Sequence, residues 1–555
     1  MRRHPLDAAR PPRHHGTVIH ATMQDRPLTV RAIFEHGRRV HPRSSVATFD
    51  GTTVGRRSFA DIAEGADRLA AALLRLGIQP GEAVATLCWN HDRHLEAYFA
   101  VPCSGAVLHT LNLRLTPDQL AYVIGHAGDR ALIVDASLLY LLEPVAAQLT
   151  TLEHVIVVGG GPTAAFPQAV SYDDVVAGET APADWPELDE RWAAAMCYTT
   201  GTTGLPKGVV YSHRSTFIHT LASCGANAFG LGERDTILLI VPMFHANAWG
   251  LPYSGWFVGA DLVLPQEHLQ GEPLSQLIAS ERITFTAGVP TILDDVSACA
   301  QRNGRSLASL RVAVCGGSAV PRRLVEEWRD RHGVPVLQGW GMTETSPIAA
   351  LAHPPKGTPP EEETEWRVKQ GRPVHGIEIR IADPEGNELP RDGVAVGEIQ
   401  VRGPWVAGGY HRDPSEDRFQ DGWLRTGDVG VIDDHGYVQI TDRLKDVIKS
   451  GGEWISSLEL EDHLLLHPGV QEVAVIAVAD ARWQERPLAC VVARPGAELT
   501  VEALRAHLEP RVTRWWIPER WAFVEAIPKT SVGKIDKKLL RAHQEAGDLP
   551  VVGKE

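Results

Sequence analysis

The sequence has no apolar run long enough to cross a lipid bilayer as a helix. A spanning helix needs about 20 consecutive, mainly apolar residues, and the 555-residue chain contains no such run. Residues 1–23 are rich in Arg and His and lack the apolar segment of a secretory signal. We therefore expect a cytoplasmic protein that has at most peripheral contact with a membrane.

Cysteine is scarce and dispersed. The seven cysteines include no C-x-x-C pair, and most lie in apolar surroundings. Disulfide frameworks and structural zinc sites both need cysteines at characteristic spacings. This pattern therefore predicts reduced, buried thiols in a cytosolic protein. The 24 histidines form no H-E-x-x-H or comparable metal-binding pattern.

Basic residues are outnumbered by acidic ones. Lys and Arg total 54 against 69 for Asp and Glu, which gives a formal net charge of −15. Nucleic-acid binding needs clustered cations, so we exclude nucleic acid as a main partner. The length predicts about two to four domains.

One stretch combines glycine, hydroxyl groups and a lysine: Thr199-Thr200-Gly201-Thr202-Thr203-Gly204-Leu205-Pro206-Lys207-Gly208. Glycines let backbone N–H groups approach a phosphate closely, and the hydroxyls and the ammonium add further donors. A Walker A loop requires Gly-Lys followed by Ser or Thr, whereas Lys207 precedes Gly208 here. The stretch therefore predicts a polyphosphate site of another type; a tight structural turn is the alternative.

Strand and helix patterns alternate from Ser45 onward. This rhythm predicts parallel sheets covered by helices. Three apolar runs, 236–241, 311–315 and 336–337, lead into loops rich in glycine or polar residues. Such loops form ligand sites in open α/β sheets. Strands are expected over 46–49, 83–87, 131–134, 155–158 and 193–198, and helices over 58–76, 91–101 and 117–126.

The pattern changes beyond residue 352. Residues 353–365 are rich in Pro and Glu and predict an exposed, mobile loop. Residues 377–381 and 397–401 alternate with period two, which predicts a small antiparallel β region. After a boundary near residue 441, a compact α+β tail is expected, with a helix over 456–466, a strand over 473–478 and a helix over 500–508.

Five motifs carry a resemblance to a known family. They are the loop 199–208, Gly339-Trp340-Gly341-Met342-Thr343-Glu344, Thr426-Gly427-Asp428, Asp442-Arg443-Leu444-Lys445-Asp446 and Gly533-Lys534. From about residue 27 to 541 the chain resembles the adenylate-forming superfamily of acyl-CoA synthetases, firefly-luciferase-type enzymes and peptide-synthetase adenylation domains. Residues 242–249 and 448–456 make it most similar to medium- and long-chain fatty-acid–CoA ligases.

The resemblance implies an α/β fold with a large N-terminal domain and a small, mobile α+β lid domain. It divides the chain into a basic flexible extension (1–25), an adenylation domain with ATP and acyl pockets (26–441), a hinge (442–447) and a lid (448–555). Whether the extension is translated stays open, because Met23 is a plausible alternative start.

The implied reaction has two steps. A carboxylate attacks the α-phosphate of ATP to give acyl-adenylate and pyrophosphate, and the thiol of coenzyme A then displaces AMP. Mg²⁺ is the implied cofactor, and the acid, ATP and coenzyme A are the substrates. The oligomeric state is open, with a homodimer suggested because relatives are often dimers.

The resemblance also implies residue roles. Lys534 bridges the attacking carboxylate and the α-phosphate, where an ammonium stabilises the transition state. Glu344 and Thr199 are the implied Mg²⁺ ligands, since Mg²⁺ takes hard oxygen donors and is shared with phosphates. The simpler alternatives are a solvated lysine for Lys534 and a helix-capping acid for Glu344.

Asp428 and Arg443 match residues that hold the ribose hydroxyls. The other implied ATP or AMP contacts are Thr199, Thr200, Gly201, Thr202, Thr203, Gly204, Lys207, Gly317, Gln338, Gly339, Thr343, Lys449 and Trp454. The remaining roles fall to His245, Trp249 and Gly317 at the acyl pocket, Lys445 at the hinge, and Gly451 and Gly452 along the coenzyme A channel. The simpler alternatives are that Asp428 lies in a surface turn, that Lys445 is a solvated lysine and that Trp249 belongs to the core.

Several other functions stay open. A ligase for a short-chain thioether acid such as 3-methylthiopropionate is the main alternative on substrate. An amino-acid adenylation domain would place an Asp just after the Phe of the motif that holds Phe244, where this chain has His245. A luciferase-type oxygenase shares every motif. A non-catalytic nucleotide-binding protein would be expected to have lost Lys534 or Glu344.

Overall fold

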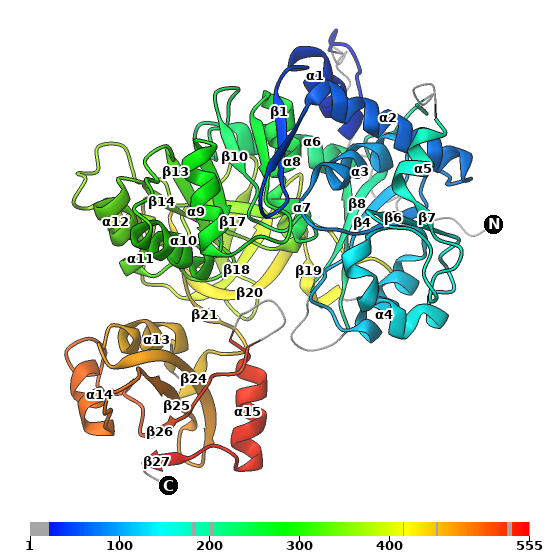
Figure 1. The fold of residues 1–555 in the computed structure, drawn as a ribbon. Helices are drawn as coiled ribbons and strands as arrows, with labels where there is room; N and C mark the ends of the chain where they lie inside the picture. Colours follow the sequence, from blue (N-terminus) through cyan, green and yellow to red (C-terminus); the bar gives the residue numbers. More distant parts are fainter. Residues whose placement is uncertain are drawn as a thin grey trace, which may run out of the picture.

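The structure, a computed structural model, describes residues 21–179, 185–199, 205–414, 416–450, 453–529 and 535–553. A large N-terminal part contains three sheets, and the chain leaves it through β21 (Val438–Arg443) to form a separate small lobe (Figure 1). This arrangement confirms the predicted α/β class with a large and a small domain. None of the described helices has the length and apolar character needed to cross a bilayer.

Two large sheets form the core of the N-terminal part. Their central strands are parallel, and antiparallel pairs lie only toward the edges. In spatial order, the first consists of β16 (Arg372–Pro373), β15 (Ile348–Leu351), β14 (Val336–Gly341), β13 (Val312–Gly316), β12 (Phe285–Gly288), β10 (Thr236–Leu238), β11 (Asp261–Leu264), β1 (Ser45–Phe49) and β2 (Val54–Ser58). The second consists of β7 (Val170–Ser171), β6 (His154–Val158), β5 (Asp129–Asp135), β3 (Ala83–Leu87), β4 (Val107–Thr110), β8 (Ala193–Tyr198) and β9 (Gly208–Ser212).

Two smaller sheets follow along the chain. The antiparallel sheet consists of β17 (Glu378–Ala382), β18 (Gly397–Arg402), β20 (Trp423–Ile432) and β19 (Phe419–Gln420), with β21 paired to β20. The sheet of the C-terminal lobe consists of β23 (Glu453–Ile455), β22 (Ile448–Ser450), β25 (Gln484–Ala493), β26 (Arg520–Phe523) and β27 (Val551–Gly553), with β24 (Val470–Asp480) paired to β25.

Helices cover the sheets of both parts (Figure 1). Those of the N-terminal part are α1 (Val30–Val40), α2 (Phe59–Arg75), α3 (Asp92–Cys103), α4 (Pro117–Ala127), α5 (Tyr172–Ala177), α6 (His213–Cys224), α7 (Ala246–Trp249), α8 (Leu251–Val258), α9 (Gly271–Ser280), α10 (Pro290–Arg302), α11 (Arg322–Glu327) and α12 (Glu363–Arg367). Those of the C-terminal lobe are α13 (Ser457–Leu465), α14 (Val501–Leu508) and α15 (Lys537–Ala546).

Most predicted elements are present, and local chemistry explains their ends. Helix α2 begins at a capping box in which Ser58 and Asp61 bond to each other's backbone N–H. The strand expected over 236–241 is shorter, because the Asn90 amide bonds to the carbonyls of Leu239 and Val241 where the strand ladder stops. The loop expected over 353–365 runs into α12, so its last residues are helical.

Trp256 on α8 lies at the centre of a cluster of aromatic residues between helices. Its ring stacks on Phe59 of α2 at 4.1 Å and contacts Phe99 of α3 at 4.7 Å between centroids. Its indole N–H donates to the Phe34 carbonyl of α1 at 3.0 Å. Four helices are therefore joined through one fully buried side chain.

Replacing Trp256 should destabilise the N-terminal part strongly. Trp256→Ala is expected to lower the free energy of unfolding by about 3–5 kcal/mol, because it leaves a cavity among packed rings. Trp192→Ala is the matched control, since that side chain is 45% exposed. Thermal unfolding of both variants would check this; equal midpoints would contradict it.

Candidate active site

Glycine brings two strand ends together at the carboxyl edge of the first sheet. Gly316 of β13 and Gly339 of β14 are register partners, and a Cβ on Gly316 would lie 2.7 Å from the Gly339 carbonyl oxygen. Gly317 follows with φ +82°, a conformation that side chains disfavour. Because open α/β sheets bind ligands at this edge, Gly317 and Gly339 are well placed for the predicted nucleotide contacts.

Gln338 directly precedes Gly339 and is buried. Its side chain is 2% exposed, and its Oε1 accepts no hydrogen bond from the described residues. A buried acceptor without a partner costs free energy, which a donor on a ligand would recover. Nearby, the Thr343 carbonyl accepts a hydrogen bond from the Tyr211 hydroxyl at 2.8 Å.

Trp249 reaches this edge through an unusual backbone turn. Ala246, Asn247, Ala248 and Trp249 all have φ between +43° and +57°, and Gly250 continues the turn at +75°. Left-handed backbone costs about 1–2 kcal/mol per non-glycine residue, so the surrounding packing must hold this turn in place. The buried indole ends 3.2 Å from the position of a Cβ on Gly316. His245 precedes the turn and is exposed, so His245 and Trp249, two of the three predicted acyl-pocket residues, lie in different surroundings.

Glu344 lies in a short 3₁₀ turn, Thr343–Thr345, directly after β14. Its side chain is buried, and Oε1 accepts a hydrogen bond from the Tyr410 hydroxyl at 2.6 Å. Its backbone carbonyl accepts from Ala407 N at 2.7 Å. The carboxylate is therefore held from a distant segment of the chain that the sequence did not indicate.

Thr199 and Lys207 close the ends of the predicted phosphate loop. Thr199 N donates to the Lys207 carbonyl at 2.9 Å, and Lys207 N donates to the Thr199 hydroxyl at 3.4 Å. The Lys207 ammonium lies 3.2 Å from an Asp413 carboxylate oxygen and 4.9 Å from the centre of the Tyr410 ring. Thr200, Gly201, Thr202, Thr203 and Gly204 lie outside the described residues.

Asp428 and Arg443 form a cross-strand pair between β20 and β21. Arg443 Nε lies 2.6 Å from Asp428 Oδ1, and the Trp340 indole N–H donates to Oδ2 at 3.0 Å. The Asp428 side chain is almost fully buried, whereas that of Arg443 is half exposed. The predicted ribose pair is thus joined to the Gly339–Glu344 motif through Trp340.

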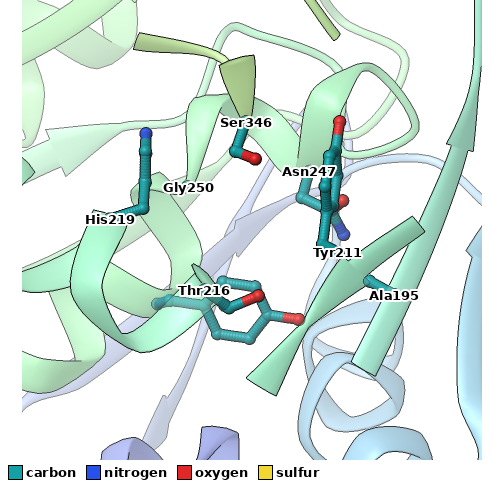
Figure 2. A pocket seen from close by; sticks show the side chains of 8 residues that line it. Ala195, Tyr211, Thr216, His219, Asn247, Gly250 and Ser346 are labelled. Atoms are coloured by element: carbon teal, nitrogen blue, oxygen red, sulfur yellow. The ribbon is translucent and has the colours of Figure 1, made fainter. Parts of the chain in front are cut away.

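A small cavity lies beside the left-handed turn (Figure 2). About 20 Å³ is available to the centre of a water molecule, which is room for about one water. Burial lowers the pKa of His219 to about 4, so this histidine is neutral at pH 7, and its Nε2 has no partner among the described residues. The sequence did not single out this lining: Ala195, Tyr211, Thr216, His219, Asn247, Gly250, Tyr253 and Ser346.

The remaining predicted residues belong to the hinge and the C-terminal lobe. Lys445 and Lys449 have exposed side chains, and Lys449 is the register partner of Trp454 in β22 and β23. This lobe has its own sheet, apart from the sheets that carry the other site residues (Figure 1). The described part of the chain does not include Lys534, Gly451 or Gly452, nor the side chain of Trp454.

A buried ion pair links α15 with α13 in the C-terminal lobe. The Lys537 ammonium lies 2.7 Å from Glu461 Oε1 and donates to the Ser457 hydroxyl at 2.7 Å. Ser457 N donates in turn to Asp442 Oδ2 at 2.5 Å, at the end of β21. The helix that follows the Gly533-Lys534 motif is therefore connected to the predicted hinge.

Two places in the described structure have side chains that could bind a metal: the cluster of Cys88, His91 and Asp135, and the Glu344 carboxylate. Cys88, His91 and Asp135 bring potential ligand atoms within 4.8 Å, but both ring nitrogens of His91 already bond, one to Asp135 and one to the backbone of His94. Burial also raises the pKa of the Cys88 thiol, which keeps it protonated. Glu344 fits Mg²⁺ better, because its carboxylate is a hard oxygen donor and, among the described residues, hydrogen-bonds through Oε1 alone.

Comparison with known proteins covers most of the chain. Residues 34–411 match the family model described as AMP-binding enzyme, and residues 459–534 match the model of its C-terminal domain. The 3-methylmercaptopropionyl-CoA ligase of Ruegeria pomeroyi is 43% identical over 94% of this chain and 98% of its own. The long-chain-fatty-acid–CoA ligase of Thermus thermophilus is 44% identical over 94% and 96%.

A solved structure resembles the whole fold. The crystal structure of the anthranilate CoA ligase AuaEII in complex with anthranoyl-AMP superposes with a TM-score of 0.84 at 28% identity, over 95% of this chain and 99% of that one. The similarity therefore extends over both the N-terminal part and the C-terminal lobe.

The Glu461–Lys537 pair should make the stability of the C-terminal lobe depend on pH. Burial is the main cause that raises the Glu461 pKa, from 4.5 to about 7. The folded state therefore holds this proton more tightly than the unfolded state. Protonated Glu461 therefore contributes fully to the free energy of unfolding below pH 4.5. This contribution is lost as pH rises through 7, by up to about 1.4 kcal/mol per pH unit.

Glu461→Gln removes this titration and should flatten the dependence between pH 5 and 7.5. Hydrogen exchange of the β24 amides, corrected for intrinsic rates, would measure it in both proteins. Burial also raises the pKa of Asp462, to about 6. Asp462 titrates in both the wild type and the variant, so its contribution cancels in the comparison. Parallel pH profiles would show that Glu461 does not titrate in this range.

Proposed function

The chain belongs to the AMP-binding enzyme family, and we propose that it is an ATP-dependent acyl-CoA ligase that releases AMP and pyrophosphate. One observation carries the proposal: Lys207, at the end of the phosphate loop, and the Glu344 carboxylate both contact Tyr410. A loop that follows β8 of the second sheet and a buried carboxylate that follows β14 of the first sheet are thus joined through one side chain. The curated relatives named above, both CoA ligases, support the same activity.

In the first step, the proposed site binds ATP with its phosphates along residues 199–207. The Lys207 ammonium would exchange its contact with Asp413 for the phosphates, which carry more charge. Gln338 and the Gly317 and Gly339 backbone would receive the adenine and the α-phosphate, and Asp428 the ribose hydroxyls. Lys534 would offset the repulsion between the attacking carboxylate and the α-phosphate.

Glu344 and Thr199 would hold Mg²⁺ together with oxygens of the bound phosphates. Bound there, the ion would neutralise the negative charge that develops during phosphoryl transfer. The protein's part is to present the free oxygen of Glu344, which the Tyr410 hydrogen bond leaves available.

In the second step, the lid over 448–555 would turn about Lys445 and admit coenzyme A past Gly451 and Gly452. Glycine at those positions leaves room for the thin pantetheine arm. Trp249, whose buried indole lies 3.2 Å from the position of a Cβ on Gly316, would form the wall between the acyl pocket and the nucleotide. We further propose that the enzyme acts in the cytoplasm and that a homodimer is its oligomeric state.

The acid is proposed to be a medium- or long-chain carboxylic acid, as for the Thermus relative. A short thioether acid is the second candidate. It is favoured by the Ruegeria relative, a 3-methylmercaptopropionyl-CoA ligase. Each added methylene contributes about 0.8 kcal/mol of transfer free energy in an apolar pocket, so chain length should separate the two candidates clearly.

A ladder of acids tests the proposed activity. Purified protein with ATP, Mg²⁺ and coenzyme A should release AMP with acids from propionate to palmitate or with 3-methylthiopropionate. The proposal expects kcat/KM to rise toward medium or long chains, whereas a maximum at the thioether acid would favour the second candidate. Absence of coenzyme-A-dependent AMP release with every acid would refute the ligase.

Lys534→Ala should separate the two half-reactions. Loss of the bridging ammonium is expected to slow formation of acyl-adenylate by at least about 100-fold. Thioester formation from supplied acyl-adenylate should stay nearly intact, because the phosphate has already been transferred. Single-turnover assays of each half-reaction would measure this, with Lys538→Ala as a nearby control. Equal loss in both half-reactions would contradict the role of Lys534.

A further inference from the structure

Tyr410 lies where two distant motifs of the proposed active site meet. It precedes β19, on the segment that follows β18, and it is half-buried. Its hydroxyl donates to Glu344 Oε1 at 2.6 Å, and the Lys207 ammonium lies over its ring at 4.9 Å. One side chain therefore contacts both the proposed metal ligand and the cation of the phosphate loop.

The backbone around Tyr410 is fixed to the same two motifs. On one side, Ala407 N donates to the Glu344 carbonyl at 2.7 Å, and the Ser346 hydroxyl donates to the Trp405 carbonyl at 2.8 Å. On the other side, His411 N donates to the Gly208 carbonyl at 2.8 Å, directly after the phosphate loop. The segment 405–411 thus connects residues 344–346 with residue 208 independently of the tyrosine side chain.

The tyrosine ring is held in one orientation. Phe419 of β19 packs against it edge to face, with centroids 5.2 Å apart and an interplanar angle of 70°. A hydrogen bond from a neutral hydroxyl to a carboxylate is among the stronger kinds, and it occupies one oxygen of Glu344. The other oxygen has no hydrogen bond from the described residues, and the Tyr410 bond restrains the orientation of the carboxylate.

We propose that Tyr410 is a positioning residue that sets Glu344 and Lys207 at a fixed spacing for the phosphates of ATP and their Mg²⁺. This inference rests on the proposed function of the site. The hydroxyl orients the carboxylate, and the ring face holds the ammonium near the loop until phosphate replaces Asp413. The two contacts use different parts of one side chain, so they can be removed separately.

The chain offers a matched control for a purely structural role. Tyr172 of α5 also donates its hydroxyl to a buried carboxylate, that of Glu96 on α3, and neither residue belongs to the five motifs. Tyr172→Phe removes the same kind of hydrogen bond and should lower stability by a similar amount. It should leave nucleotide binding unchanged.

The test compares Tyr410→Phe, Tyr410→Leu and Tyr172→Phe by calorimetric binding of a non-hydrolysable ATP analogue, with and without Mg²⁺. Tyr410→Phe keeps the ring and should reduce only the gain in affinity that Mg²⁺ provides, by about tenfold. Tyr410→Leu should also weaken binding without Mg²⁺, because the ring under Lys207 is lost. The apparent KM for Mg²⁺ in AMP release should rise for both Tyr410 variants.

Two results would overturn the inference: Tyr410→Phe behaving like Tyr172→Phe, or Tyr410→Phe losing equal affinity with and without Mg²⁺. The outcome is separable from that of the proposed function. A wild-type protein that binds the magnesium nucleotide but releases no coenzyme-A-dependent AMP would refute the ligase and leave the binding test of Tyr410 valid. A wild type that binds no nucleotide would refute both.

Discussion

The geometry of this protein depends on where parallel strands end. Because β13 and β14 run in parallel, their carboxyl ends lie side by side, and the loops that follow must share one edge of the sheet. Glycine at 316 and 339 permits the close approach, since any side chain on Gly316 would meet a backbone oxygen. Trp249 closes this edge on one side, and the turn that carries Glu344 begins on the other. The proposed nucleotide site is thereby assembled from segments that are far apart in the sequence.

The edge needs support from elements outside the sheet. The antiparallel β region supplies it: Asp428 on β20 bonds to Trp340, and the segment 405–411 bonds to both Glu344 and Gly208. This small β region thus holds two of the five motifs in place, the loop 199–208 and the stretch 339–344. In the C-terminal lobe, the buried Lys537–Glu461 pair and Ser457 connect α15 to the end of β21. Removing one partner of such a pair is costly because the other charge is left buried.

Much of the fold could be read from the sequence, and the misses have identifiable causes. Strong periodicity and capping residues located helices such as α2 and α4 within a residue or two, because these signals are local. The strand at 236–241 was overestimated, because a side chain from another segment, Asn90, takes its backbone hydrogen bonds. The left-handed turn over 246–250 left no local signal except Gly250, because tertiary packing imposes it on Ala, Asn and Trp.

The sequence by itself determined the family and the reaction type, because those depend on residue types in a fixed order: a Thr- and Gly-rich loop, Glu344, Asp428, Arg443 and Lys534. It also determined the α/β class, through the alternation of strand and helix patterns. Only the tertiary structure decided which other side chains serve the motifs. Tyr410 and Glu344 are separated by 66 residues, and the polar lining around His219 comes from several elements. Contacts between such distant residues have no periodicity or spacing in the chain, since they are made only when the sheets and loops pack together.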